Sequence, residues 1–252
     1  MPRVLREIKK DSLIASLLPA HKNLNIFEVS AGGAHLARTL RDMGHVVTIS
    51  NLHSYGHAQY GLEEHEIDIN LPDVSLPKAP FDAILCREVI EHVENIPHAL
   101  RIFERHLKPQ GVVILTLPNR LCLRSRLYYL LTGFYRGMPK PINLKYPLGE
   151  EHINLVGYPE LEYFLTKSGL TITSAQASEI DMLDNITLCL LPLFWISTHY
   201  FLLKHKSKLE GYEVETDADI KRISKMRDAL LSRDLFIGKD LVIAAQKSGE
   251  SG

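Results

Sequence analysis

Cysteine is scarce in this sequence. Three cysteines, Cys86, Cys122 and Cys189, occur among 252 residues, and no two of them form a C-x-x-C pair. Disulfide-stapled domains and zinc knuckles need several closely spaced cysteines, so both classes are excluded. So few cysteines are typical of the reducing cytoplasm, and we expect a cytoplasmic protein, with a peripheral position at the inner membrane face as the alternative.

An excess of charge of one sign is also missing. The chain has 29 Lys and Arg against 30 Asp and Glu, which gives a formal net charge of −1. A protein that binds nucleic acid through its surface potential usually carries a basic excess, so no nucleic-acid partner is expected. Residues 1–21 lack the uninterrupted apolar stretch of a signal peptide, because charges occur throughout them.

What the sequence does contain is a regular alternation of apolar runs and helical patterns. Strands are predicted at 24–30, 45–50, 65–70, 81–86, 112–119, 170–176 and 239–247. Helical patterns lie between some of them, at 34–44, 96–111 and 158–169. This alternation predicts an α/β fold, a mostly parallel seven-stranded sheet with helices on both faces.

The first predicted strand leads into a turn of small residues, which reads EVSAGGA from Glu28 to Ala34. In parallel sheets, ligands bind at the carboxyl ends of the strands, which is where this turn lies. Glycine permits a positive φ there and leaves room for a ligand to approach the backbone. On its own the turn is equally compatible with a cofactor site and with a plain chain reversal.

A longer pattern follows the fourth predicted strand. The order FD, EVIEHV, LKPQG and LTLPN, within residues 81–119, resembles the class I S-adenosylmethionine-dependent methyltransferases. It is similar above all to the branch that includes ubiquinone-biosynthesis O-methyltransferases and bacterial glycan- or lipid-associated methyltransferases. The segment EEHINLVGYPELEYFLTKSGLTIT, residues 150–173, resembles the same branch. The resemblance covers about residues 24–176 and the last strand.

The resemblance implies a single Rossmann-like methyltransferase domain over residues 1–252, with S-adenosylmethionine as cofactor. It also implies cofactor contacts from Glu28, Ser30, Gly32, Gly33, Asn51, Asp68 and Arg87. Within that set Asn51 would face the ribose, Asp68 the adenine amine, and Arg87 the methionine end.

The chain departs from the family pattern at three positions of this implied site. Ser30 and Ala34 stand where glycines are usual, and Asn51 stands where an acid is usual. The departures leave a second hypothesis open, a non-catalytic relative that serves as a binding or scaffold subunit. A nicotinamide-dependent oxidoreductase is disfavoured, because the chain lacks G-x-G-x-x-G and an acid at the end of the second strand.

Two histidines are the candidates for catalysis. Methyl transfer is an in-line displacement, so the protein mainly aligns donor and acceptor. A hydroxyl acceptor would also need a general base, for which His92 and His152 are the candidates, with Glu91 and Glu151 as orienting neighbours. A structural role for His92, as the cap of a turn, is the alternative.

The spacing of Glu88, Glu91 and His92 is i, i+3, i+4, which would place all three on one face of a helix. Two carboxylates and an imidazole form a tentative set for a divalent metal. We expect no resident metal, because a solvated helix start explains the same acids and one helix leaves much of a metal shell unfilled.

Two segments are additional to the strands and helices of a minimal doubly wound domain. Residues 120–150 interleave basic and aromatic side chains, which suits an anionic head group, a membrane surface or a lid over the site. Residues 178–237 form an apolar, helical insertion before the last strand, and within it 186–203 are the most apolar run. For that run we weigh an in-plane membrane helix or a substrate-pocket wall against a buried or homodimer-forming helix.

These features predict a methyltransferase that acts on a small acceptor. The expected acceptor is lipophilic or linked to a glycan or lipid, and a hydroxyl is the expected methylation site.

Overall fold

The computed structural model describes residues 3–137, 144–145, 151–181, 183–206 and 217–249. Its strands are β1 (Asn25–Val29), β2 (Val46–Asn51), β3 (Glu63–Glu66), β4 (Phe81–Arg87), β5 (Leu107–Pro118), β6 (Leu170–Ala177) and β7 (Asp240–Lys247). Its α-helices are α1 (Arg3–Ser16), α2 (His35–Asp42), α3 (Ile96–His106), α4 (Leu123–Thr132), α5 (Tyr158–Lys167), α6 (Leu191–Lys206), α7 (Asp217–Leu230) and α8 (Arg233–Ile237). Short 3-10 helices are η1 (His57–Tyr60), η2 (Ile90–His92) and η3 (Leu183–Leu190).

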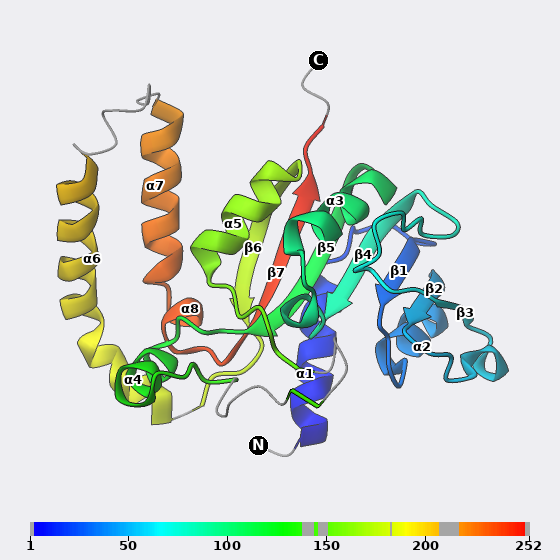
Figure 1. Cartoon of the computed structure of the whole chain (residues 1–252), viewed down its shortest axis with the longest axis horizontal. Coiled ribbons are helices and arrows are strands. Elements are labelled where there is room, and N and C mark those ends of the chain that lie inside the picture. The colour runs from blue at the N-terminus through cyan, green and yellow to red at the C-terminus, as the bar shows by residue number, and fades with distance from the viewer. Residues whose placement is uncertain (1–2, 138–143, 146–150, 182, 207–216, 250–252) are drawn as a thin grey trace.

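All seven strands form one sheet with the order β3-β2-β1-β4-β5-β7-β6 (Figure 1). Only β7 runs antiparallel to its neighbours, and the other pairs of this sheet are parallel. The mostly parallel seven-stranded sheet predicted from the sequence is therefore confirmed. The chain reverses its direction of progress between β1 and β4, and ligands of such sheets bind beside that switch point.

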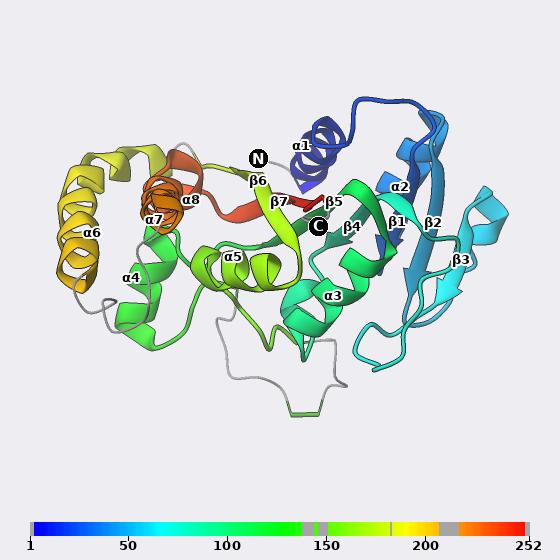
Figure 2. The ribbon, with the colours of Figure 1, turned by 90° about the horizontal axis from the view of Figure 1, so that it is seen from above.

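Alternate side chains of the central strands pack into two separate cores. Phe27 and Val29 of β1 contact a core that contains α3 and α5, whereas Ile26 belongs to the core under α1 and α2. Figure 2 shows these two pairs of helices on opposite faces of the sheet. Both faces of each central strand are buried, which explains why the strands read as continuous apolar runs.

Two element boundaries differ from the prediction. The helix expected over 96–111 ends at His106, and β5 begins directly at Leu107. Lys108 precedes Pro109, and a residue before proline is disfavoured in the helical region, so the chain leaves the helix early. The strand expected over 65–70 instead covers Glu63–Glu66 at the sheet edge, and the residues after it turn toward the carboxyl ends of β1 and β4.

The insertion before β7 extends past the β6 edge of the sheet (Figures 1 and 2). Leu235 of α8 is part of the main core, and a small apolar cluster adds a second contact, in which Phe236 of α8 packs with Leu123 of α4 and Phe194 of α6. The Phe194 and Phe236 ring centroids lie 5.2 Å apart. None of the helices in the described segments has the length and apolar character that crossing a bilayer requires.

Candidate active site

The turn after β1 adopts an unusual backbone. Ser30, Gly32 and Ala34 have φ values of 49°, 53° and 51°, all in the left-handed region. Glycine adopts this region freely, but a residue with a Cβ is strained there by about 1 kcal/mol or more. Two of these three positions carry a Cβ, so the surrounding structure must hold the turn in place.

Hydrogen bonds from β2 and η1 hold this turn. The Gly32 N–H donates to Asn51 Oδ1 at 2.8 Å, and the Ala31 N–H donates to the Ser50 carbonyl at 2.9 Å. From the other side, the buried His57 ring donates through Nε2 to the Gly32 carbonyl at 2.7 Å. A carbonyl can only accept, so this contact assigns the proton of neutral His57 to Nε2.

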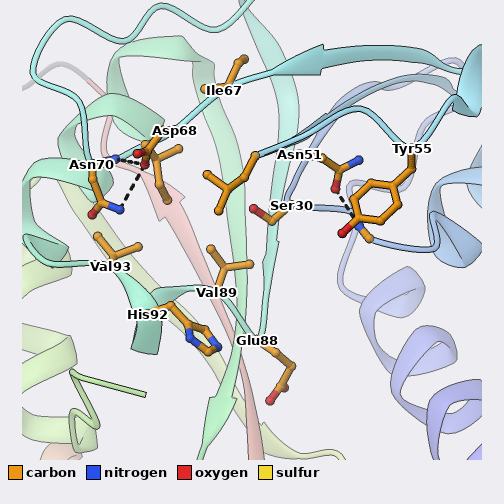
Figure 3. Close-up of a pocket in the computed structure, with 13 residues that line it drawn as sticks. Ser30, Asn51, Tyr55, Ile67, Asp68, Asn70, Glu88, Val89, His92 and Val93 are labelled. Atoms are coloured by element: carbon orange, nitrogen blue, oxygen red, sulfur yellow. Dashed lines mark hydrogen bonds between the residues drawn. The ribbon is translucent and has the colours of Figure 1, made fainter. Parts of the chain in front are cut away.

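A pocket of about 220 Å³ opens beside the turn, at the carboxyl ends of the parallel strands (Figure 3). Its walls come from four segments, 30–32, 51–55, 67–70 and 88–93. Ile67, Val89 and Val93 give the pocket apolar side chains, and Ser30, Asn51 and Asp68 give it polar ones. A flat heterocycle with a polar sugar needs such a combination of walls.

Two observations show that the pocket fits an adenosine. A Cβ built on Gly32 has no atom within 4 Å, so the space above this glycine is open to a ligand. Asp68 Oδ1 accepts both hydrogen bonds from Asn70, and Asp68 Oδ2 has no hydrogen-bond partner in the described part of the chain. That free oxygen is an acceptor for an amine or a hydroxyl.

A second cavity, of about 940 Å³, lies on the other side of the turn between α1 and α2. Ser30 and Glu88 line both cavities, so the two meet at the end of β1. Arg87 stands in its wall and donates to Glu28 Oε1 at 3.2 Å and to Asp11 Oδ1 at 2.8 Å. Lys10 of α1 donates to Glu88 at 3.0 Å, and Glu88 accepts a second bond from the Thr116 hydroxyl at 2.7 Å.

Two polar atoms in this second cavity wall are buried without a partner, Glu28 Oε2 and Arg87 Nε. Burial raises the pKa of Glu28 to about 7, against the opposing effect of the Arg87 guanidinium. The carboxylate of Glu28 and the cations of Lys10 and Arg87 stand in the same wall, and charges of both signs suit a ligand that carries both an ammonium and a carboxylate. The methionine end of S-adenosylmethionine has that charge pattern.

The residues predicted to bind the cofactor are therefore divided between the two cavities. Ser30, Gly32, Asn51 and Asp68 line the first, whereas Glu28, Gly33 and Arg87 line the second, which Ser30 also borders. The side chain of Asn51 is already engaged, because its Oδ1 accepts from Gly32 and its Nδ2 donates to Glu64 at 2.8 Å. Asn51 thus secures the turn on which a cofactor would rest.

The two candidate catalytic histidines come together. The rings of His92 and His152 meet edge to face with centroids 4.6 Å apart, although 59 residues separate them in the chain. Burial, and then the neighbouring His152, lower the pKa of His92. His92 Nδ1 lies 3.0 Å from the Glu151 carbonyl, so neutral His92 carries its proton on Nδ1 and leaves the Nε2 lone pair free.

The tentative metal set is arranged differently from the prediction. Glu88 to His92 do not form an α-helix, because η2 covers three residues only and Glu88 has a φ of 51°, so the condition for a shared helix face is not met. Instead Glu91, His92 and His152 bring one ligand atom each within 4.8 Å of one another. Both Glu91 oxygens are buried without a hydrogen-bond partner, and burial raises the pKa of Glu91 to about 8.

Several site residues were missed by sequence reasoning. Lys10 and Asp11 reach the site from α1, and His57 and Glu64 support the turn. The α1 residues sit in an ordinary amphipathic pattern with many charges. Glu64 is one of four charged or polar residues in the run EEHE, so nothing local distinguished it.

The chain is similar to known methyltransferases in sequence. Residues 3–175, well over half of the chain, match the family described as Methyltransferase domain. The ubiquinone biosynthesis O-methyltransferase of Rickettsia canadensis is 26% identical over 172 residues, which cover 64% of this chain and 69% of that protein. Other Rickettsia proteins of the same name match over 36% to 47% of their own length, so the chain spans less than half of these relatives.

Solved structures share the fold. An S-adenosylmethionine-dependent methyltransferase from Mesorhizobium loti superposes with a TM-score of 0.53 at 14% identity, over 94% of this chain and 97% of that one. A 1,6-didemethyltoxoflavin-N1-methyltransferase from Burkholderia thailandensis, solved with S-adenosylhomocysteine, gives 0.51 at 14% identity, over 98% and 77%. The chain belongs to the Methyltransferase domain family and is a class I methyltransferase that uses S-adenosylmethionine.

Proposed function

We propose that this methyltransferase acts on a hydroxyl of a small lipophilic acceptor, or of one linked to a lipid or glycan. The observation that carries the proposal is the state of His92. Its Nδ1–H is donated to a backbone carbonyl, its pKa is lowered, and its ring lines the first cavity. A neutral imidazole with a free Nε2 is a general base, which hydroxyl methylation needs. The curated relatives, named as O-methyltransferases, support the same chemistry.

The two cavities suggest how the cofactor lies. The adenosine would occupy the first cavity, with its amine or ribose hydroxyls near Asp68 and the turn at Ser30 and Gly32. The methionine end would reach the second cavity, where Lys10 and Arg87 provide positive charge and Glu28 provides an acceptor. Because Ser30 and Glu88 border both cavities, the reacting sulfonium would lie near them.

When bound, S-adenosylmethionine supplies a methyl carbon activated by its positive sulfur. The chain would hold the acceptor oxygen in line with that methyl carbon, opposite the sulfur, which would be the leaving group and keep the bonding pair. His92 Nε2 accepts the hydroxyl proton. His152 stands against the His92 ring and restricts its orientation. The main contribution of the chain is alignment of the acceptor with the methyl group.

We also propose that residues 120–150 and 178–237 receive the acceptor, at a membrane surface. Of the first segment, residues 138–143 and 146–150 lie outside the described residues, and 182 and 207–216 of the second do so too. Exposed apolar side chains cover α4 and α6, namely Leu127, Tyr128, Tyr129, Leu130, Leu131, Leu193, Trp195, Ile196, Tyr200 and Phe201. Basic Arg124 accompanies them and is 61% exposed. Apolar and aromatic side chains beside cations are typical of an interfacial membrane contact.

A labelling experiment tests the acceptor class. The protein is incubated with methyl-labelled S-adenosylmethionine and a bacterial lipid extract, and the label is followed into the organic phase. An O-methyl ether resists alkaline hydrolysis, whereas a methyl ester releases labelled methanol. We expect alkali-stable label in the lipid phase, and label confined to water-soluble products would contradict a lipophilic acceptor.

The second hypothesis, a non-catalytic subunit, is favoured by the strained turn. Ser30 and Ala34 hold left-handed φ values without being glycine. Calorimetric titration with S-adenosylhomocysteine separates the two hypotheses. Binding with a dissociation constant in the micromolar range supports the enzyme, and no heat at millimolar ligand supports the subunit.

A further inference from the structure

One carboxylate behind the cofactor turn collects an unusual number of donors. Glu64 Oε1 accepts from Asn51 Nδ2 and from the Tyr55 N–H, both at 2.8 Å. Its Oε2 accepts from the His57 N–H at 2.9 Å and from the Ser54 hydroxyl at 3.0 Å. A surface acid on an edge strand needs no such shell, because water would solvate it.

These bonds belong to a closed ring that includes the turn. Gly32 donates to Asn51, Asn51 donates to Glu64, and His57 donates its backbone N–H to Glu64. The His57 ring then donates to the Gly32 carbonyl, which closes the ring. Both peptide groups of the strained glycine are therefore tied to the same carboxylate, one through an amide and the other through an imidazole.

We propose that Glu64 is the positioning residue of the cofactor turn, and that it fixes Gly32 for adenosine binding through Asn51 and His57. Glu64 does not line either cavity, so it acts without touching the cofactor. The assignment rests on the proposed cofactor placement, because the turn matters only if the adenosine lies against it.

The charge of Glu64 is suited to this role. Partial burial would raise its pKa, but the N–H groups of Tyr55 and His57 and the side chains of Asn51 and Ser54 lower the pKa to about 2. The group is thus ionised at any working pH, and hydrogen bonds to an ionised acceptor are the stronger kind. A carboxylate accepts all four bonds, whereas the NH₂ group of a glutamine accepts none, so whichever way that amide is turned two of the four donors lose their acceptor.

Neighbouring acids do not share the role. Glu63 pairs instead with Lys78 and His65, and neither of these residues is part of the ring. Glu66 is the register partner of Asn51 in the β2–β3 pair, but its side chain accepts from the Ser54 N–H at 3.0 Å and is not the acceptor of the Asn51 side chain or the His57 N–H, both of which donate to Glu64. Glu66→Gln therefore is a matched control, since it removes one charge from the same strand and leaves the ring intact.

The first test compares Glu64→Gln with Glu66→Gln by calorimetric titration of S-adenosylhomocysteine. We expect the dissociation constant to rise about tenfold or more in Glu64→Gln, because bonds to an ionised group are lost, and to stay within about twofold in the control. Amide hydrogen exchange of the ligand-free protein gives an independent reading. Gly32 and His57 should exchange faster in Glu64→Gln than in wild type, while the strands of the core keep their protection.

A charge swap provides the stronger test. Asn51→Asp alone places a second carboxylate 2.8 Å from Glu64, and we expect it to weaken binding by about tenfold or more. In the double variant Asn51→Asp, Glu64→Gln, the amide at position 64 can turn its NH₂ group toward position 51 and donate to the new carboxylate there, at the loss of the acceptor of the Tyr55 N–H. That carboxylate can still accept from Gly32. The double variant should therefore bind more tightly than Asn51→Asp alone, which a general loss of stability would not produce.

The outcomes separate this inference from the function on which it rests. If wild-type protein does not bind S-adenosylhomocysteine, the proposed function fails. If wild type binds while Glu64→Gln binds equally well, or the double variant is no better than Asn51→Asp, the role of Glu64 is refuted and the function stands.

Discussion

Ser30, Gly32 and Ala34 put three left-handed residues within five positions of one turn. Sequence reasoning identified the turn as a ligand site but treated the missing glycines as a weakness. In the structure, hydrogen bonds from Asn51 and His57 hold Gly32, which lies between the two positions where glycine is missing. These hydrogen bonds come from residues that lie 19 and 25 positions away from Gly32, so no local sequence pattern could have predicted them.

Gly32→Asp should abolish cofactor binding. The new side chain would project into open pocket space, where it would displace the adenosine and repel the Asp68 carboxylate. Gly44→Asp is the matched control, because Gly44 also has a positive φ, 92°, and open space at its Cβ, but lines neither cavity.

Both of these variants should be destabilised similarly, by about 1–2 kcal/mol for the left-handed residue, as measured by urea unfolding. Only Gly32→Asp should lose S-adenosylhomocysteine binding in calorimetry. Wild-type affinity in Gly32→Asp would refute the placement of the adenosine.

Glu91 should make stability depend on pH. Its pKa rises from an ordinary 4.5 to about 8 in the folded state, so between these values the folded chain holds a proton that the unfolded chain has released. The free energy of unfolding therefore falls as pH rises through this window. Glu91→Gln mimics the neutral carboxyl and removes this dependence.

Urea unfolding of both proteins from about pH 5 to about pH 8.5, with EDTA present, measures the effect. The stability of Glu91→Gln relative to wild type should increase steadily across the range. A difference that stays constant with pH would show that Glu91 is ionised in the folded protein throughout.

Among the elements, the order of strands and helices followed closely from the sequence, because buried parallel strands read as apolar runs between amphipathic helices. The local geometry around Glu88 did not follow, since the i, i+3, i+4 spacing gives a shared face only if the segment is an α-helix, and the chain makes a single 3-10 turn there. The pairing of His92 with His152 was equally invisible, because the meeting of two loops depends on tertiary packing. The packing of α1 against the second cavity, where Lys10 and Asp11 line the wall, also depends on tertiary structure and was not predicted.

Helix α6 exposes several large apolar side chains. Leu193, Ile196 and Tyr200 are 64%, 62% and 64% exposed. Replacing all three with Gln should lower the fraction of protein that sediments with anionic liposomes several-fold. The free energy of unfolding should change by less than about 0.5 kcal/mol per site, because exposed side chains contribute little to stability.

Met43 and Val46, at the other end of the sheet, supply the control, since they are 60% and 56% exposed. Replacing both with Gln should leave liposome binding unchanged. If wild-type protein never sediments with liposomes and instead runs as a dimer that the α6 variant dissociates, a second copy of the chain covers α6 and the membrane proposal is wrong.

At the scale of the whole molecule, the fold brings the carboxyl ends of β1, β2 and β4 together with α1 around one point. Ser30 and Glu88 mark that point, because both cavities border on them. The first cavity has apolar and hydrogen-bonding walls, and the second has buried charges of both signs. The central claim is that one S-adenosylmethionine molecule spans the two.

A crystal structure of the chain with S-adenosylhomocysteine tests that claim most directly. The adenosine should lie beside Gly32 and Asp68, the sulfur near Ser30 and Glu88, and the amino-acid end in the second cavity against Arg87 and Lys10. A ligand whose amino-acid end points away from the second cavity, or no ligand density at millimolar concentration, would contradict the account.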